Sequence, residues 1–135
     1  MSAGRFVVSE DAKTVTDTQT GLTWSRNDVG DGDLDFAEAE AAIAKLNEEN
    51  LAGHTDWRLP TVHELFGLVD VTRTGPAIDV EAFPTCARDW YWTGTPHACS
   101  PSAYAWAVFF DCGSASGCHR GGDCRVRAVR GSSRQ

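Results

Sequence analysis

The apolar positions in the first half of the chain recur at intervals of three and four residues, which is typical of amphipathic helices. One such segment runs from Phe36 to about Asn50, and its single narrow apolar stripe consists of Phe36, Ala39, Ile43 and Leu46. A second helix is expected from Val62 to about Asp70, with inward side chains at Leu65, Leu68 and Val69. Gly53 lies between the two segments and is a stop signal for the first helix.

Capping residues mark where both helices begin. Asp35 is followed three residues later by Glu38, and Thr61 by Glu64. In such a capping box each residue's side chain bonds the backbone N–H of the other. Pro60 stands directly before the second box, where it disfavours helix at the preceding residue. The sequence therefore predicts that an extended arm turns into a helix at Thr61.

Segments of alternating or β-favouring residues predict strands at both ends of the chain. The expected strands cover residues 5–9, 14–17, 22–25, 90–93, 104–111 and 125–130. The second and third form a hairpin through a polar Thr-Gln-Thr-Gly turn, and Trp24 should face inward. In the last strand, Val126 and Ala128 are expected to face the core.

The strand over 104–111 has the clearest alternation. The side chains predicted to face the core are Trp106, Val108 and Phe110. Because successive side chains of a strand point to opposite faces, the others must point away from it. These outward residues are Ala107, Phe109 and Asp111.

The order of these elements predicts an α+β fold in which the helices are segregated from the strands. The 135 residues suffice for one domain over 1–135, without internal repeats or a linker. Hydrophobic residues make up 41% of the chain, so the core must be economical, and five Trp and six Phe supply much of it. No apolar run reaches the length of about 18 residues that a membrane span requires.

The stretch Asp56-Trp57-Arg58-Leu59-Pro60-Thr61 forms the corner before the second helix. Trp57 and Leu59 have the bulk to anchor this corner in the core, and Asp56 and Arg58 are candidates for an internal ion pair. We interpret the stretch as a structural corner rather than a catalytic site.

This corner also carries a family resemblance. Trp57-Arg58-Leu59-Pro60-Thr61 followed by Glu64-Leu65 resembles the signature of the C-terminal domain of the Legionella collagen-like protein. It is similar, more distantly, to a segment of formylglycine-generating-enzyme domains. Further matches follow in order at residues 15–24, at 91–95, and at 104–106 through 126–130. The resemblance implies a C-type-lectin-like fold with two helices packed on a small antiparallel sheet, in which the first and last strands pair and the termini lie close together.

The net charge of −7 is unevenly distributed. Residues 1–85 hold 6 basic and 16 acidic side chains, whereas residues 86–135 hold 6 basic and 3 acidic ones. An acidic body argues against nucleic acid as a partner. The arginines near the C-terminus alternate with apolar residues, which suits the outer face of a strand.

All five cysteines lie in the C-terminal part, at Cys86, Cys99, Cys112, Cys118 and Cys124. The odd number leaves at least one free or paired between chains, and one or two disulfides remain open in an oxidising compartment. The spacing does not match zinc sites. The alternating Asp31, Asp33 and Asp35 resemble a calcium loop, but the closing Glu of an EF-hand is missing. We therefore expect no metal and no cofactor.

The segment from Cys86 to Arg134 contains no Lys, Glu, Gln, Met, Leu or Ile. Its stretch 111–124 has no hydrophobic period, so we expect a surface loop between two strands. Small polar residues around fixed aromatics suit adaptable contacts. Domains of the resembled fold include variable proteins of diversity-generating retroelements, in which adenine-containing codons are randomised, and residues about 90–130 fit the resulting alphabet at their non-core positions. A GC-rich genome favours many of the same residues, and the two explanations stay open.

Two function classes follow. The first is a non-enzymatic receptor-binding or adhesion module that displays a C-terminal surface to a protein or glycan. For the Legionella relative the ligand is a glycosaminoglycan; the acidic body of this chain weighs against such a ligand, but the local charge of +3 over residues 86–135 leaves it open. The alternative is an enzyme of the formylglycine-generating type acting on a protein. His54, His63, His97 and His119 are scattered and no nucleophile elbow is present, which favours the first class.

The binding surface is predicted on the outward positions of the C-terminal strands and loop. The candidate residues are Tyr91, Thr93, Thr95, His97, Tyr104, Ala107, Phe109, Asp111, Ser114, Ser116, His119, Arg120, Asp123 and Arg125. The N-terminal residues have no apolar signal core. The sequence leaves the oligomeric state open, and equally whether the domain works in the cytoplasm, in a virion or within a larger cell-surface assembly.

Overall fold

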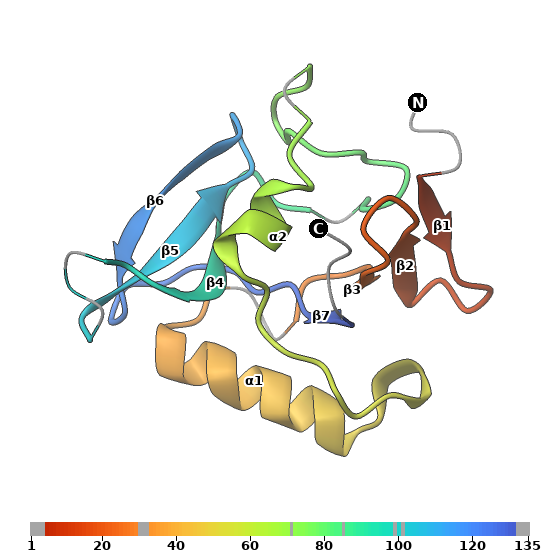
Figure 1. Cartoon of the computed structure of the whole chain (residues 1–135), viewed down its shortest axis with the longest axis horizontal. Helices are drawn as coiled ribbons and strands as arrows, with labels where there is room; N and C mark the ends of the chain where they lie inside the picture. Colours follow the sequence, from red (N-terminus) through yellow and green to blue (C-terminus); the bar gives the residue numbers. More distant parts are fainter. Residues whose placement is uncertain are drawn as a thin grey trace.

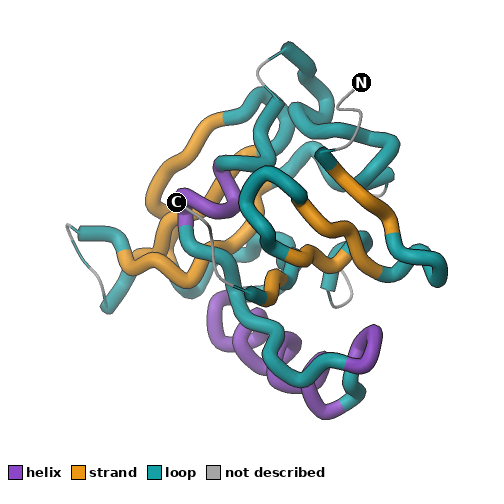
Figure 2. The backbone as a smooth tube through the Cα atoms, turned by 45° about the vertical axis from the view of Figure 1, so that its right-hand side comes forward, coloured by secondary structure: helices purple, strands orange, loops and turns teal. Residues whose placement is uncertain are grey.

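Two antiparallel sheets and two α-helices make up the fold in the described part of this chain (Figure 1). The structure is a computed structural model and describes residues 5–29, 33–70, 72–84, 86–98, 100 and 102–131. The α+β class predicted from the sequence is confirmed. Helix α2 lies between the two sheets and α1 runs beneath them, as both views show (Figures 1 and 2).

The first sheet has the strand order β1-β2-β3-β7. Its strands are β1 (Phe6–Val8), β2 (Thr14–Asp17), β3 (Thr23–Ser25) and β7 (Val129–Arg130). The predicted hairpin is confirmed, with Val15 opposite Trp24, and both side chains are fully buried. The expected pairing of the first and last strands is wrong, because β1 pairs only β2 and β7 pairs only β3. Two strands therefore separate β1 from β7.

The second sheet has the strand order β4-β5-β6. Its strands are β4 (Trp90–Pro96), β5 (Tyr104–Phe109) and β6 (Ser114–His119). The predicted surface position of residues 111–123 is confirmed, but the expectation of a loop over 111–124 is wrong, since β6 lies inside it. Gly113 adopts a positive φ of 83° and donates its N–H to the carbonyl of Phe109, at 2.9 Å. This turn folds the chain back onto β5. Because β6 is held by its backbone pairing with β5, it forms a strand without a hydrophobic period of its own.

Both helices begin at the predicted capping boxes. Helix α1 (Phe36–Glu48) starts after Asp35, whose side chain accepts from the Glu38 N–H while Glu38 returns the bond. Helix α2 (Val62–Phe66) starts after Thr61 with the same reciprocal bonds. It is shorter than predicted, because Gly67 forms its C-cap. A short 3₁₀ helix, η1 (Leu51–Gly53), follows α1.

The corner before α2 is built as predicted around Trp57, but its ion pairs differ. Trp57 is 3% exposed, and its ring N–H donates to the carbonyl of Leu51. Arg58 pairs with Glu64, at 2.8 Å, rather than with Asp56. Asp56 instead pairs with Arg130 of β7, at 2.7 Å. The corner is thus fastened to α2 on one side and to the last strand on the other.

The core consists of two clusters, one on each face of the second sheet. One cluster joins Leu65 of α2 with Tyr91, Val108 and Phe110. The other joins Trp92, Ala105 and Ala107 with α1 and with the segment 124–128. Because both faces are covered, the predicted outward orientation of Ala107 is wrong, and its exposure is 0%. The small side chain lets the covering segment approach the sheet closely.

The last predicted strand, 125–130, is regular only in β7. Residues 124–128 run extended beside the second sheet, with isolated bridges to Leu34 and Tyr91. Val126 and Ala128 are buried as predicted, but Arg127 is also fully buried. The expectation that the arginines line an outer face is therefore wrong for Arg127. No helix among the described residues has the length and apolar character needed to cross a membrane.

Candidate ligand-binding site

A groove of about 410 Å³ lies between α2 and the second sheet. Helix α2 is only five residues long and turns Leu65 into the core, which leaves Phe66 41% exposed at the groove's rim. Each strand of the sheet contributes one lining residue. The lining is Val62, His63 and Phe66 from α2, Thr95 from β4, Trp106 from β5 and Ala115 from β6. We call this the α2 groove.

Trp106 of the groove lining packs against the ring of His97. Their ring centroids lie 4.7 Å apart, with an angle of 33° between the planes. The His97 ring lies over Gly117, which pairs across the strands with Trp106; a Cβ atom on Gly117 would lie 2.5 Å from His97 Cδ2. The absence of a side chain at Gly117 therefore makes room for the histidine. Trp106 is only half-buried, which corrects its predicted place in the core, because α2 ends before covering it.

A second aromatic pair lies on the opposite face of the sheet. Trp90 and Phe109 are directly opposite each other on β4 and β5, and their rings stack at 4.7 Å. Ser114, the partner of Phe109 on β6, is exposed, and so is Ser116. The predicted outward orientation of Phe109 thus holds in part, since the ring is half-buried against Trp90.

The predicted binding residues fall into three exposure classes. The exposed ones are Tyr104, Ser114, Ser116, His119 and Asp123. The half-exposed ones are Thr95, His97, Phe109, Asp111, Arg120 and Arg125. The fully buried ones, at 0% exposure, are Tyr91, Thr93 and Ala107. The last three cannot touch a ligand, which corrects their prediction as contact residues.

Buried hydrogen bonds explain why Tyr91 and Thr93 point inward. The Tyr91 hydroxyl donates to Asp28, at 2.7 Å, and accepts from the Ala87 N–H, at 2.8 Å. Burial raises the pKa of this hydroxyl. Thr93 donates to the carbonyl of Trp106, at 2.7 Å. Both side chains therefore stabilise the sheet from its buried side.

The structure does not gather the remaining predicted residues into one patch. Thr95 lines the α2 groove and His97 packs on Trp106, whereas Phe109, Ser114 and Ser116 share the opposite face. Tyr104 and His119 meet edge to face at 5.3 Å, at the far end of the hairpin. Asp111 pairs with Arg88, and Arg125 with Asp28, Asp33 and Asp89, so these charges already have partners.

Sequence reasoning missed five residues that line the groove: Val62, His63, Phe66, Trp106 and Ala115. One signal was available for Phe66. The inward stripe of the predicted helix over 62–70 passes through Leu65 and Leu68, which leaves the neighbouring aromatic off the stripe. An aromatic outside a helix's apolar face is a candidate contact residue.

The family model of the Lcl C-terminal domain matches residues 13–130, which include every lining residue of the α2 groove. The chain belongs to the Lcl C-terminal domain family. This confirms the resemblance noted on the corner at Trp57. Among curated proteins, none matches the chain significantly.

The described cysteines of this Lcl C-terminal domain are free thiols. A hydrogen bond from the Cys124 thiol lowers the pKa of Cys118 to about 7, and the same contact raises the pKa of Cys124. Burial raises the pKa of Cys86. Cys99 and Asp31 lie outside the described residues. Within the described part of the domain, no three His, Cys, Asp or Glu side chains come close enough to hold a metal ion.

Proposed function

We propose that this Lcl C-terminal domain is a non-enzymatic ligand-binding module whose ligand contacts the α2 groove. The observation that carries the proposal is the aromatic lining, in which exposed Phe66 and half-buried Trp106 belong to a groove of about 410 Å³. Exposed aromatic side chains around a concavity are typical of contact sites, because their burial by a ligand contributes a large hydrophobic free energy. The ligand class is a protein or a glycan.

The charge of the groove lining bears on which of these ligands fits. Its lining contains no Asp, Glu, Lys or Arg. The nearest carboxylate on α2, Glu64, is held by Arg58 through two hydrogen bonds of 2.8 and 2.9 Å. A sulfated or otherwise anionic glycan would find no Lys or Arg among the described lining residues, so an uncharged ligand surface fits the groove better.

The enzymatic alternative would rest on the thiol pair Cys118 and Cys124. Cys118 packs with the core cluster on the face opposite α2, whereas the groove is on the α2 face. A substrate held in the groove would therefore be separated from this thiol by the sheet. We propose that alkylation of the domain with iodoacetamide leaves ligand binding unchanged, whereas a formylglycine-generating type of activity would be lost.

We also propose a C-type-lectin-like fold whose C-terminal surface is diversified by a retroelement. The support is that Ser114, Ser116, His119 and Asp123 are exposed, while the aromatics beneath them hold the framework. The test is the surrounding DNA. A near-copy of the coding region for residues 90–130, differing at adenines and adjoining a reverse-transcriptase gene, is expected; its absence leaves base composition as the explanation.

Groove dependence of binding is the direct test of the proposed function. Neutral glycans on an array and a displayed library of linear peptides serve as probes of the full chain. Phe66→Ser and Trp106→Ser are expected to weaken the selected probes about tenfold or more, as for hot-spot side chains. Val7→Ser is the matched control, because Val7 is 52% exposed on β1 and lies outside the groove. Binding that both groove variants retain would overturn the proposal.

A further inference from the structure

Strand β6 is an edge strand whose outer side has no neighbour among the described residues (Figure 1). Its six residues pair with β5 without a shift in register, from Ser114 opposite Phe109 to His119 opposite Tyr104. The Arg120 N–H donates to the carbonyl of Ala103, at 2.8 Å, in the same register. Because hydrogen-bonded pairs alternate in antiparallel strands, Ala115 and Gly117 direct their backbone N–H and C=O away from β5.

The opposite edge of the same sheet is covered by the chain itself. The Trp92 N–H donates to the carbonyl of Arg125, at 2.9 Å, and Arg125 returns a bond of 2.8 Å to Trp90. Gly94 donates to Pro60 farther along β4. The two edges of the sheet therefore differ, and only β6 offers a row of backbone groups to another chain.

Natural proteins protect exposed edges with lysine, proline, bulges or very short strands. None of these is present in β6, whose sequence Ser-Ala-Ser-Gly-Cys-His spans six regular pairs. Its small side chains also leave the backbone accessible from the side. An unprotected edge of this kind is the template that peptide-binding domains use for strand addition.

The α2 groove meets this edge at Ala115. Ala115 lines the groove and also directs backbone groups outward, so both features belong to one surface. A strand added to β6 would lie about 4.8 Å from it, with alternate side chains on the α2 face of the sheet. Those side chains would lie beside Ala115 and Gly117, on the same face as Phe66 and Trp106.

The charges around this surface favour an apolar segment. Between Asp111 and Arg120 the hairpin has no Asp, Glu, Lys or Arg, and the groove lining has none either. A glycan could fill the groove but could not match a ladder of alternating backbone donors and acceptors. An extended polypeptide can fill the groove and also pair with the β6 edge. Its main-chain hydrogen bonds contribute affinity and its apolar side chains contribute specificity.

We propose that the α2 groove and the β6 edge together bind an extended segment of a protein partner, which adds a fourth strand to the β4-β5-β6 sheet. Alternate apolar side chains of the segment enter the groove between Phe66 and Trp106. This inference rests on the proposed function, since it names the partner class for the same groove.

The test uses linear peptides selected from a displayed library against the full chain. Each selected peptide is resynthesised with one backbone nitrogen methylated at a time, and its dissociation constant is measured by fluorescence anisotropy. Strand addition predicts a period of two: methylation at alternate positions weakens binding about tenfold or more, because it removes a ladder hydrogen bond, and the intervening positions tolerate it.

Ala115→Pro tests the protein side of the same ladder. Proline removes the outward N–H of residue 115, and it is tolerated on an edge strand where the N–H faces away from the partner strand. Peptide binding is expected to fall about tenfold or more. Val7→Ser, on the edge strand β1 of the other sheet and outside the groove, is the control that should leave peptide binding unchanged. If Ala115→Pro lowers the melting temperature strongly, the methylation series on the native chain decides.

Three results would overturn the inference. If the dissociation constant does not depend on which backbone nitrogen is methylated, the peptides bind without forming a ladder of hydrogen bonds to β6. Selection of neutral glycans only, with binding lost in Phe66→Ser, would refute the peptide partner while the proposed function stands. The third result is a dimer in analytical ultracentrifugation that Ala115→Pro dissociates and that the peptides do not dissociate. It would show that a second copy of the chain, rather than a partner's segment, occupies the β6 edge.

Discussion

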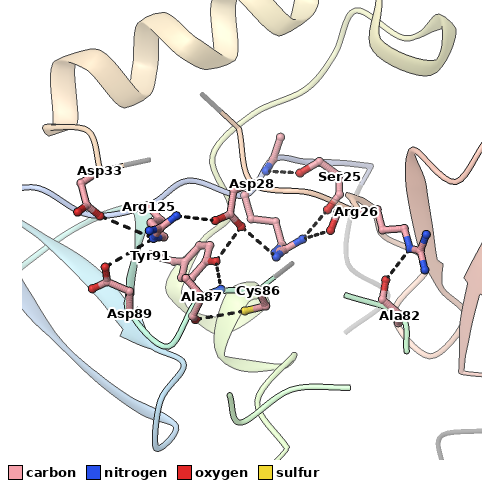
Figure 3. Close-up of polar contacts among 12 residues, drawn as sticks. Ser25, Arg26, Asp28, Asp33, Ala82, Cys86, Ala87, Asp89, Tyr91 and Arg125 are labelled. Atoms are coloured by element: carbon pink, nitrogen blue, oxygen red, sulfur yellow. Dashed lines mark hydrogen bonds and ion pairs between the residues drawn. The ribbon is translucent and has the colours of Figure 1, made fainter. Parts of the chain in front are cut away.

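The guanidinium of Arg127 donates to the carboxylate of Asp28 from a position without solvent exposure. The Nη2 to Oδ1 distance is 3.3 Å, and the exposed fractions of the two side chains are 0% and 13%. Asp28 also accepts from the Tyr91 hydroxyl, at 2.7 Å (Figure 3). Through these bonds the loop after β3, the C-terminal segment and β4 are held together. The Arg127 guanidinium carbon also lies over the Phe83 ring, 4.6 Å from its centroid.

Replacing Asp28 by Asn should destabilise the domain strongly. The substitution leaves the buried charge of Arg127 without its counter-ion, and breaking a buried ion pair in this way costs about 3–5 kcal/mol. The free energy of unfolding in urea measures the loss. Asp56→Asn is the matched control, because it breaks the exposed pair with Arg130 and should change stability little. Equal effects of the two substitutions would contradict the structural role of the buried pair.

Trp57→Ala should also unfold a large part of the population at moderate temperature. Trp57 is 3% exposed, and its removal leaves a cavity at the corner before α2. Large-to-small substitutions of this type cost about 3–5 kcal/mol. Thermal unfolding followed by circular dichroism gives the measurement. The same substitution at half-buried Trp106 should cost less stability and reduce binding instead; an unchanged melting temperature for Trp57→Ala would refute the role of the corner.

The features that could be predicted from the sequence are local ones. The capping boxes at Asp35 and Thr61 depend on residues three positions apart, and both form as expected. The hairpin that buries Trp24 depends on a short turn between two alternating segments. In each case the interacting groups are neighbours in the chain, so the sequence alone contains the relevant geometry.

The features that could not be predicted depend on distant segments. Ala107 is buried because residues 124–128 cover a face of the sheet that alternation alone would leave exposed. Arg127 is buried because it finds Asp28, which lies 99 positions away. Strand β6 has no hydrophobic period, and its pairing with β5 determines its structure. The α2 groove was missed for the same reason, since four separate elements build it.

Glu64→Gln should reduce the dependence of the free energy of unfolding on pH in the acidic range. Burial raises the pKa of Glu64, but two hydrogen bonds from Arg58 and those from Thr61 outweigh it, so the pKa lies below its ordinary value of 4.5. The unfolded chain therefore binds more protons in this range, and stability falls as the pH drops below about 4.5 through the folded-state pKa. Urea unfolding between about pH 3 and pH 6 measures the slope. A variant with the native slope would show that Glu64 contributes nothing to it.

Cys118 should react with iodoacetamide at a rate that rises with a midpoint near pH 7. The Cys124 thiol donates a hydrogen bond that stabilises the Cys118 thiolate and lowers its pKa to about 7. Thiolates are the reactive form, so the alkylation rate follows this pKa. Peptide mass spectrometry separates the modification of Cys118 from that of exposed Cys112 and buried Cys86.

Two substitutions at Cys124 distinguish the hydrogen bond from a general effect of the surroundings. Cys124→Ala removes the donor, and burial then acts alone on Cys118, which should move the midpoint upward to or beyond the ordinary value of 9.0. Cys124→Ser retains a hydroxyl donor of similar size, so the midpoint should stay well below that value. A midpoint that is the same in both variants would exclude the Cys124 thiol as the cause, because only one of the two can donate to the thiolate.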